Sequence, residues 1–249
     1  MCILSCFFTP DATPATVSPQ PGRMARGAAL STLVIFSMVL IAADRPPVEP
    51  GPFHRSELVE LSRLDSSFHL DIRYATTNNF IGRAVYTEPR AFLQRPAAEA
   101  LARVQRSLKK QGFGLVIFDG YRPWRVTKIF WEAMPADKKQ FVADPSLGSV
   151  HSRGCAVDLT LRHLKNGSPA RMPSEFDEWT ERSRIDYPGG SADSRRLRDL
   201  LCREMEAEGF LRYELEWWHY TWKDWDQYAV EDLLFPEIPV PREDPMKGR

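Results

Sequence analysis

The chain has 249 residues, of which 43% are hydrophobic and 27% carry a charged side chain. This composition predicts a globular protein that buries one sizeable core, and one domain is the default expectation. Lysine plus arginine equals aspartate plus glutamate at 33 each, so no net charge favours nucleic acid or an acidic membrane surface, and we expect no nucleic-acid partner.

The first predicted element is a leader at residues 1–43. Its apolar stretch, residues 28–43, is uncharged, follows Arg23 and Arg26, and ends in small residues. This is the layout of a signal peptide, and the stretch is short for a bilayer span. We therefore expect export to the periplasm without stable membrane insertion after cleavage. A membrane anchor formed by an uncleaved leader is the alternative, and Met24 is a second candidate start.

A proline-rich linker is predicted next, at residues 44–62, because four prolines follow the leader almost at once. The single domain is predicted at residues 63–249. In it, alternating apolar residues from Leu70 to Tyr74 predict a strand. Apolar residues at helical spacing between Ala97 and Leu108 predict a helix that stops at Gly112.

The second half of the domain continues the mixture. Residues 114–119 form a short apolar run that predicts a central strand, and helical patterns cover about 124–142 and 194–208. Residues 155–161 and 216–222 have the aromatic and β-branched density of strands. We predict an α+β fold: a single domain with a central, mostly antiparallel sheet flanked by helices. The chain contains no GxGxxG or P-loop motif, which argues against a nucleotide-binding doubly wound fold.

Two stretches carry candidate metal ligands. S-V-H-S-R-G-C-A-V-D contains His151 and Asp158, and E-W-W-H contains His219. Two imidazoles and a carboxylate match the ligands of catalytic zinc, which leaves a fourth position for water. Gly154 allows a tight reversal between the first two residues, so that the site would lie on the sheet. On spacing alone, satisfied structural residues are an equal alternative.

Glu216 precedes His219 by three positions, where a carboxylate can reach water bound to a metal. Such a residue can accept a proton from that water and pass it to the leaving amine. Flanking tryptophans predict partial burial, which would raise the pKa of Glu216 towards a useful range. Glu214 is the second candidate base.

Cys155 lies inside the proposed metal segment. Its small neighbours predict a buried thiol rather than a ligand. Spacing leaves the pairing of Cys155 with Cys202 open.

These motifs resemble, in order, segments of the D-alanyl-D-alanine dipeptidase family of the M15 superfamily of zinc peptidases. The similarity extends over roughly 64–228. The segments that carry it are R-Y-A-T-T-N-N-F (73–80), F-D-G-Y-R-P (118–123), H-S-R-G-C-A-V-D-L-T-L (151–161), F-D-E-W-T-E-R-S (176–183) and L-E-W-W-H-Y (215–220).

The resemblance implies a role for individual residues. His151, Asp158 and His219 match the ligands of one zinc ion per chain, and Glu216 matches the catalytic base. Arg122 matches the arginine that stabilises the oxyanion, a role that suits its fixed charge and planar donors. The resemblance also places Asp177 and Tyr74 at the substrate's free amino end and Ser149 at its carboxylate end.

The expected function is zinc-dependent hydrolysis of the small dipeptide D-alanyl-D-alanine to two D-alanines, in the turnover of cell-wall dipeptide. One alternative is a D,D-carboxypeptidase that trims peptidoglycan stem peptides, although Asp177 favours a substrate with a free amine. A second alternative is a zinc-binding module without catalysis. The leader departs from family members that act on cytoplasmic dipeptide. The oligomeric state stays open.

Overall fold

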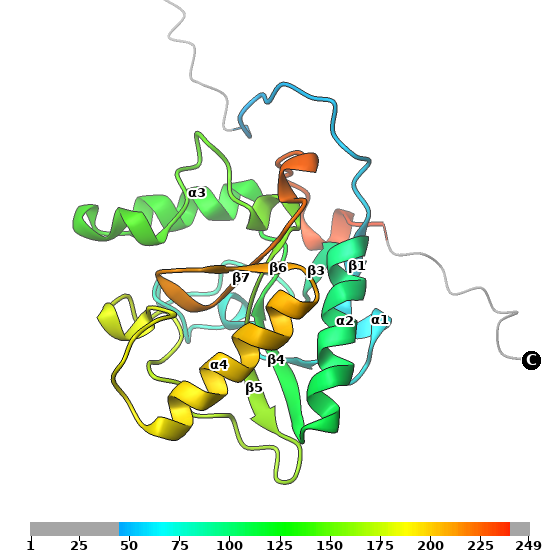
Figure 1. The fold of residues 1–249 in the computed structure, drawn as a ribbon. Helices are drawn as coiled ribbons and strands as arrows, with labels where there is room; N and C mark the ends of the chain where they lie inside the picture. Colours follow the sequence, from blue (N-terminus) through cyan, green and yellow to red (C-terminus); the bar gives the residue numbers. More distant parts are fainter. Residues whose placement is uncertain (1–44, 240–249) are drawn as a thin grey trace, which may run out of the picture. The chain divides into compact units, whose positions relative to one another are not determined.

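The computed structural model of the protein describes residues 45–239 (Figure 1). The predicted leader at residues 1–43 lies outside the described residues. Within the part of the chain that the structure describes, no helix is both long enough and apolar enough to cross a bilayer.

The centre of the described chain is a five-stranded sheet with the order β2-β4-β5-β7-β6. Its strands are β2 (His69–Leu70), β4 (Phe113–Asp119), β5 (Ala156–His163), β6 (Phe210–Tyr213) and β7 (Glu216–Trp222). β2 pairs with β4 in parallel, and the other three pairs are antiparallel. The prediction of an α+β fold with a mostly antiparallel sheet is therefore confirmed.

A second, two-stranded sheet lies beside the first and pairs β1 (Leu58–Glu60) with β3 (Phe92–Gln94). The four-residue helix α1 (Leu61–Leu64) follows β1 directly. β1 and the start of α1 fall inside residues 44–62, the segment that the sequence predicts as a linker. Its last residues are thus part of the folded unit, and Leu58 and Leu61 are buried.

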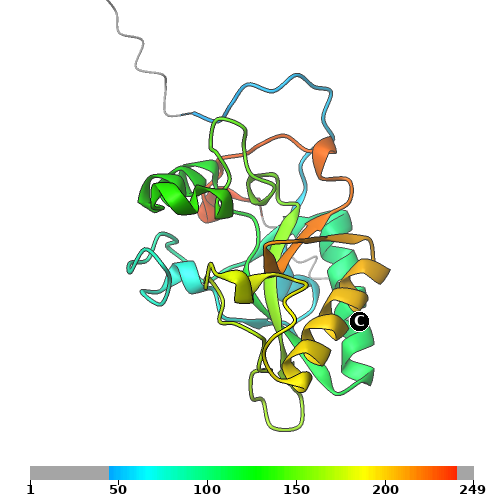
Figure 2. The same cartoon turned by 60° about the vertical axis from the view of Figure 1, so that its left-hand side comes forward.

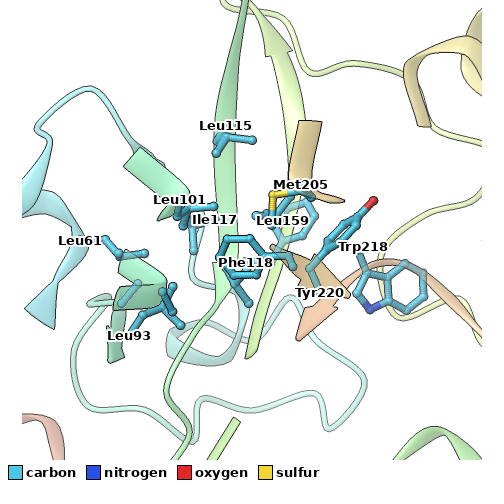
Figure 3. Packing of buried hydrophobic residues seen from close by; sticks show 14 of the residues in the cluster. Leu61, Leu93, Leu101, Leu115, Ile117, Phe118, Leu159, Met205, Trp218 and Tyr220 are labelled. Atoms are coloured by element: carbon cyan, nitrogen blue, oxygen red, sulfur yellow. The ribbon is translucent and has the colours of Figure 1, made fainter. Parts of the chain in front are cut away.

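One face of the large sheet is covered by α2 (Arg95–Lys110) and α4 (Ala192–Ala207), which lie side by side in Figures 1 and 2. α2 buries the apolar stripe that its sequence spacing predicts. α4 begins after Ser191, whose side-chain oxygen accepts a hydrogen bond from the backbone N–H of Ser194. The core between the helices and the sheet contains Leu101, Leu115, Ile117, Leu159 and Met205, none of which is exposed (Figure 3).

The opposite face of the sheet carries connections instead of long helices. Figure 2 shows the segment after β2 and part of the segment after β5 on this side. The remaining helix, α3 (Trp124–Ala133), follows β4. Short 3-10 turns lie in the connections, at Arg73–Ala75, Ala136–Phe141, His151–Arg153, Glu181–Ser183, Trp225–Gln227 and Phe235–Glu237.

Two predicted elements are shorter in the structure. The helix expected over 124–142 ends at Ala133, because Pro135 disfavours helical backbone at Met134, which is extended. The strand expected from Leu70 to Tyr74 ends at Leu70, and a 3-10 turn over Arg73–Ala75 follows it. This turn directs Tyr74 into the interior beside Phe130, with ring centroids 4.5 Å apart.

Candidate active site

Three candidate metal ligands meet over one face of the paired strands β5 and β7. Asp158 on β5 and His219 on β7 are a directly opposed antiparallel pair, so their side chains leave the sheet on the same face. His151 reaches this face from the 3-10 turn that precedes β5. Gly154 ends that turn in the left-handed region at φ 69°, which supplies the reversal expected from the sequence.

The ligand atoms have the spacing of a tetrahedral zinc site. His219 Nδ1 lies 3.0 Å from Asp158 Oδ1 and 3.1 Å from His151 Nε2, and His151 Nε2 lies 3.4 Å from Asp158 Oδ1. Tetrahedral donors about 2.0–2.1 Å from a zinc ion are separated by about 3.3–3.4 Å. The residues present therefore fit the ion that the resemblance implies.

Outer hydrogen bonds fix which nitrogen of each histidine faces the site. His151 Nδ1 lies 2.8 Å from the carbonyl oxygen of Gly120, which can only accept, so Nδ1 carries the proton and Nε2 keeps its lone pair. His219 Nε2 lies 3.1 Å from Thr221 Oγ1, which leaves Nδ1 for the site. Such outer partners orient metal-ligating histidines in other proteins.

The electrostatics of the triad also suit a cation. Burial opposes the charge on Asp158, but His151 and His219 hold the pKa of this carboxyl well below its usual range. Burial lowers the pKa of His219, which favours the neutral imidazole that a metal requires. Lone pairs of three atoms thus converge on one point, and a divalent cation relieves their mutual repulsion.

A single cavity of about 260 Å³ adjoins the triad. The eight residues given a metal-binding, catalytic or substrate-binding role in the preferred reading of the sequence line it, although they come from separate parts of the chain. They are Tyr74, Arg122, Ser149, His151, Asp158, Asp177, Glu216 and His219. The fallback base Glu214 is exposed and is not among the lining residues.

Glu216 lines the cavity together with His219 although the two are three residues apart on a strand, a spacing that normally places side chains on opposite faces. The pairing of β6 with β7 is regular up to Arg212 and Tyr220, and then shifts so that Tyr213 pairs with Glu216. This irregularity breaks the alternation and re-aims the glutamate. Burial, with the nearby charge of Asp158, raises the pKa of Glu216 well above its ordinary value.

Arg122 is held by Asp119, a residue that the sequence analysis did not single out. Asp119 Oδ2 accepts a hydrogen bond from Arg122 Nε at 2.9 Å and lies 2.8 Å from Nη2 in an ion pair, while its Oδ1 accepts from the Tyr86 hydroxyl at 2.8 Å. Burial opposes the charge of Arg122, but Asp119 raises its pKa above the ordinary value. The guanidinium also lies over the Phe130 ring, 4.5 Å from its centroid.

Asp177 lines the cavity, is half-buried, and has a positive φ of 60°, which is uncommon for a residue other than glycine. The Tyr74 hydroxyl is 3.1 Å from each carboxyl oxygen of Asp177 and can donate to either. Burial, reinforced by the negative charge of Asp158, raises the pKa of Asp177 to about 8. A half-buried carboxyl in this environment would be stabilised by a cationic group that entered the cavity.

Ser149 and Cys155 flank the metal-binding turn in different ways. Ser149 is buried, lines the cavity, and accepts a hydrogen bond from the backbone N–H of His151 at 3.2 Å. Cys155 is buried behind the turn, and burial raises the pKa of its thiol to about 12, which disfavours the thiolate that a ligand or a nucleophile requires. Cys155 and Cys202 are both free thiols.

The sequence analysis missed two features of the site. One is Asp119, for which the only signal was its place in F-D-G-Y-R-P beside Arg122. The other is an aromatic wall formed by Phe80, Phe141 and Trp179, which line the same cavity. The rings of Phe80 and Trp179 are 4.6 Å apart, and those of Phe141 and Trp179 are 6.4 Å apart. These residues come from three connections, so no local pattern joins them.

Known proteins with similar sequences share one description. A family model described as D-ala-D-ala dipeptidase matches residues 54–238. The chain is 38% identical over 165 residues to the D-alanyl-D-alanine dipeptidase of Escherichia coli (strain K12), which covers 66% of this chain and 84% of that protein. It is 37% identical over 184 residues to the protein of that name from Enterococcus faecium, and the match covers 67% of this chain and 91% of that protein. It is 36% identical over 186 residues to the D-alanyl-D-alanine dipeptidase of Streptomyces coelicolor, and the match covers 66% of this chain and 90% of that protein.

Proposed function

The chain belongs to the D-alanyl-D-alanine dipeptidase family of zinc peptidases, and from this membership we propose that it hydrolyses D-alanyl-D-alanine to two D-alanines. In this proposal His151, Asp158 and His219 hold one zinc ion per chain, and Glu216 is the catalytic base.

One observation carries the proposal: the three candidate metal ligands line the same cavity as the buried Glu216, the buried Arg122 and the Asp177 carboxyl, which could bind an amine. A module in which zinc only holds the fold needs the triad alone. The additional groups are expensive to bury, because each is ionisable. Their presence is understandable if they act on a bound substrate.

In this proposal Glu216 carries out the proton transfers. A bound zinc ion would act as a Lewis acid that polarises the scissile carbonyl and lowers the pKa of water. Glu216 accepts a proton from the attacking water and delivers it to the nitrogen of the leaving D-alanine. Its raised pKa, caused by burial, helps the carboxyl to hold that proton between the two transfers.

Arg122 stabilises the negative charge that develops on the substrate oxygen during attack. Its side chain is already fixed by Asp119 and by the ring of Phe130, so little reorganisation is needed when the charge appears. The dipeptide carries an ammonium group at one end and a carboxylate at the other, and each end needs its own hydrogen-bonding partners. Asp177 and Tyr74 bind the ammonium group, and Ser149 hydrogen-bonds the carboxylate.

The cavity suits a substrate that ends at its amino group. Tyr74, which contacts Asp177, packs against Phe80 with ring centroids 6.3 Å apart, and Phe80 packs in turn on Trp179. A peptide extended beyond the amine would meet this aromatic wall and would separate Asp177 from its cationic partner. Hydrolysis of a free dipeptide is therefore favoured over trimming of a longer stem peptide.

The direct test is release of D-alanine from D-alanyl-D-alanine by the purified protein, with and without a chelator, beside a stem pentapeptide. We expect chelator-sensitive release from the dipeptide alone, restored by added zinc. Release from the pentapeptide would reassign the protein as a carboxypeptidase. Zinc binding without release from either substrate would favour the module that lacks catalysis.

Export is a separate proposal that rests on the leader predicted at residues 1–43, and it would make dipeptide released by wall turnover the natural substrate. Cell fractionation and N-terminal sequencing of the mature protein test it. A periplasmic product that begins near Asp44 is expected, and an intact leader in the membrane fraction would support the anchored alternative.

A further inference from the structure

Residues 45–57, which precede β1, form hydrogen bonds with the segment that follows β7. The carboxylate of Glu49 accepts a hydrogen bond from the backbone N–H of Val230 at 2.9 Å. The backbone N–H of His54 donates to the carbonyl oxygen of Gln227 at 2.8 Å, and its ring lies edge-on to Tyr228, with centroids 5.5 Å apart. Glu49 lies before residues 54–238, the range that matches the family model.

The second partner of Glu49 is Arg153, two residues after the candidate ligand His151. Both guanidinium Nη atoms of Arg153 donate to the Glu49 carboxylate, and Nη1 also donates to the carbonyl oxygen of Tyr228 at 2.6 Å. The guanidinium lies over the Trp225 ring, 5.3 Å from its centroid. Only 7% of the Arg153 side chain is exposed, so Glu49 is the anion that compensates a buried charge.

The Arg153 guanidinium also lies near the start of the loop from which it comes. A Cβ placed on Gly148 would lie 3.7 Å from Nη2 of Arg153, so one side chain lies close to both ends of residues 148–154. That segment carries Ser149 and His151. The guanidinium is paired with Glu49, which lies outside the segment.

We propose that Glu49 is a positioning residue for the metal site: by pairing with Arg153, it holds residues 148–154 in the conformation that aims His151 Nε2 at the zinc ion. The inference rests on the proposed function, because it takes His151 as a ligand. Prolines at positions 46, 47, 50 and 52 restrict the backbone on both sides of Glu49, which lowers the entropy lost when the segment docks.

The test measures zinc release from the zinc-loaded full chain into an excess of a coloured chelator. Loss of a residue that orients a metal ligand typically costs about 10–100-fold in metal affinity, and Glu49 acts one step further away, so we expect Glu49→Gln to release zinc about 3–10-fold faster. In an Arg153→Gln background the same substitution should add little, because the interaction it removes is already absent.

Glu60→Gln is a matched control. Glu60 also receives two hydrogen bonds from one arginine, Arg90, at 3.0 and 2.8 Å, and Arg90 lies 4.7 Å from the centroid of the Phe92 ring. This pair does not involve residues 148–154. We expect Glu60→Gln to lower the unfolding midpoint of the zinc-free protein without accelerating zinc release.

Unchanged zinc release in Glu49→Gln would overturn the proposal, even if the variant were less stable. Equal acceleration in Glu49→Gln and Glu60→Gln would also overturn it, because release would then follow general loosening. A His151→Ala protein separates this result from the proposed function. If that variant retained zinc as the parent does, the ligand assignment itself would fail.

Discussion

The two faces of the central sheet bury different kinds of side chain. The face under α2 and α4 is filled by aliphatic and sulfur-containing side chains such as Leu101, Leu159 and Met205, none of which is exposed. The other face buries ionisable groups, among them Asp158 and Glu216, around a cavity. The same strands contribute to both faces, because alternate residues point in opposite directions.

The difference separates stability from chemistry within one sheet. Apolar burial on the helix-covered face stabilises the fold by roughly 1.5–3 kcal/mol per fully buried large side chain. Carboxyls that line the cavity cost free energy where burial opposes their charge, as the raised pKa values of the buried Glu216 and the half-buried Asp177 indicate. Substitutions on the two faces should therefore give opposite signatures in activity and stability.

The largest effect is expected from Glu216→Gln on the cavity face. It removes the proton acceptor while keeping the shape of the side chain, so kcat should fall by about 10³-fold or more. Zinc content, measured by metal analysis, should stay at one ion per chain. Normal turnover by a zinc-loaded Glu216→Gln protein would rule this residue out as the base, and a loss of zinc would show that it supports the metal instead.

Leu101→Ala tests the helix-covered face. Removing a fully buried leucine from α2 leaves a cavity, and the free energy of unfolding should fall by about 2–5 kcal/mol, measured by urea denaturation. kcat for the dipeptide should stay within about twofold, because Leu101 lies on the side of the sheet away from the site. The exposed Leu211 is a control whose replacement by alanine should change stability by less than about 0.5 kcal/mol. A large loss of kcat in the folded Leu101→Ala protein would contradict the separation of the two faces.

Arg122→Lys tests the oxyanion role while keeping a positive charge beside Asp119. A lysine cannot reproduce the planar guanidinium that hydrogen-bonds Asp119 through Nε and pairs with it through Nη2, so we expect kcat to fall by about 10²-fold with little change in zinc content. Asp119→Asn should give a smaller loss, since it only loosens the arginine. If Arg122→Lys left kcat unchanged, this residue would have no place in the mechanism.

Asp177→Asn should reveal the cost of the amine site as a pH dependence in the zinc-free protein. The folded pKa of Asp177 is raised from 3.8 to about 8, so between these values the unfolded chain loses a proton that the folded chain keeps, and stability falls as pH rises. The neutral variant lacks this loss and should gain about 3–4 kcal/mol on the parent between pH 5 and pH 8.5.

Thermal or urea unfolding at the two pH values measures this gain. The same Asp177→Asn substitution should raise KM for the dipeptide by about 10-fold or more, because a charged hydrogen bond to the ammonium group is lost. A pH-independent difference in stability would show that Asp177 is not ionised at a cost in the folded protein. An unchanged KM would remove it from substrate binding.

The sequence determined which residues are available for chemistry. His151, Asp158, Glu216 and His219 stand in short motifs, and such local spacing is visible in a linear chain. The apolar stripe of α2 and the strand character of β4 and β5 were also predictable, because helical and extended backbones impose different periods on buried positions. The roles given to Arg122, Asp177, Tyr74 and Ser149 came from resemblance to a family rather than from spacing, and they stay predictions.

Only the tertiary structure decided how these residues meet. Strand alternation alone would place Glu216 and His219 on opposite faces, and the irregular pairing of β6 with β7 overrides it. Asp119 binds Arg122 across the connection between β4 and α3, and Glu49 reaches Arg153 from more than a hundred residues away. A sequence records which side chains are present and their local periodicity, whereas contacts between distant segments depend on the packing of the whole chain.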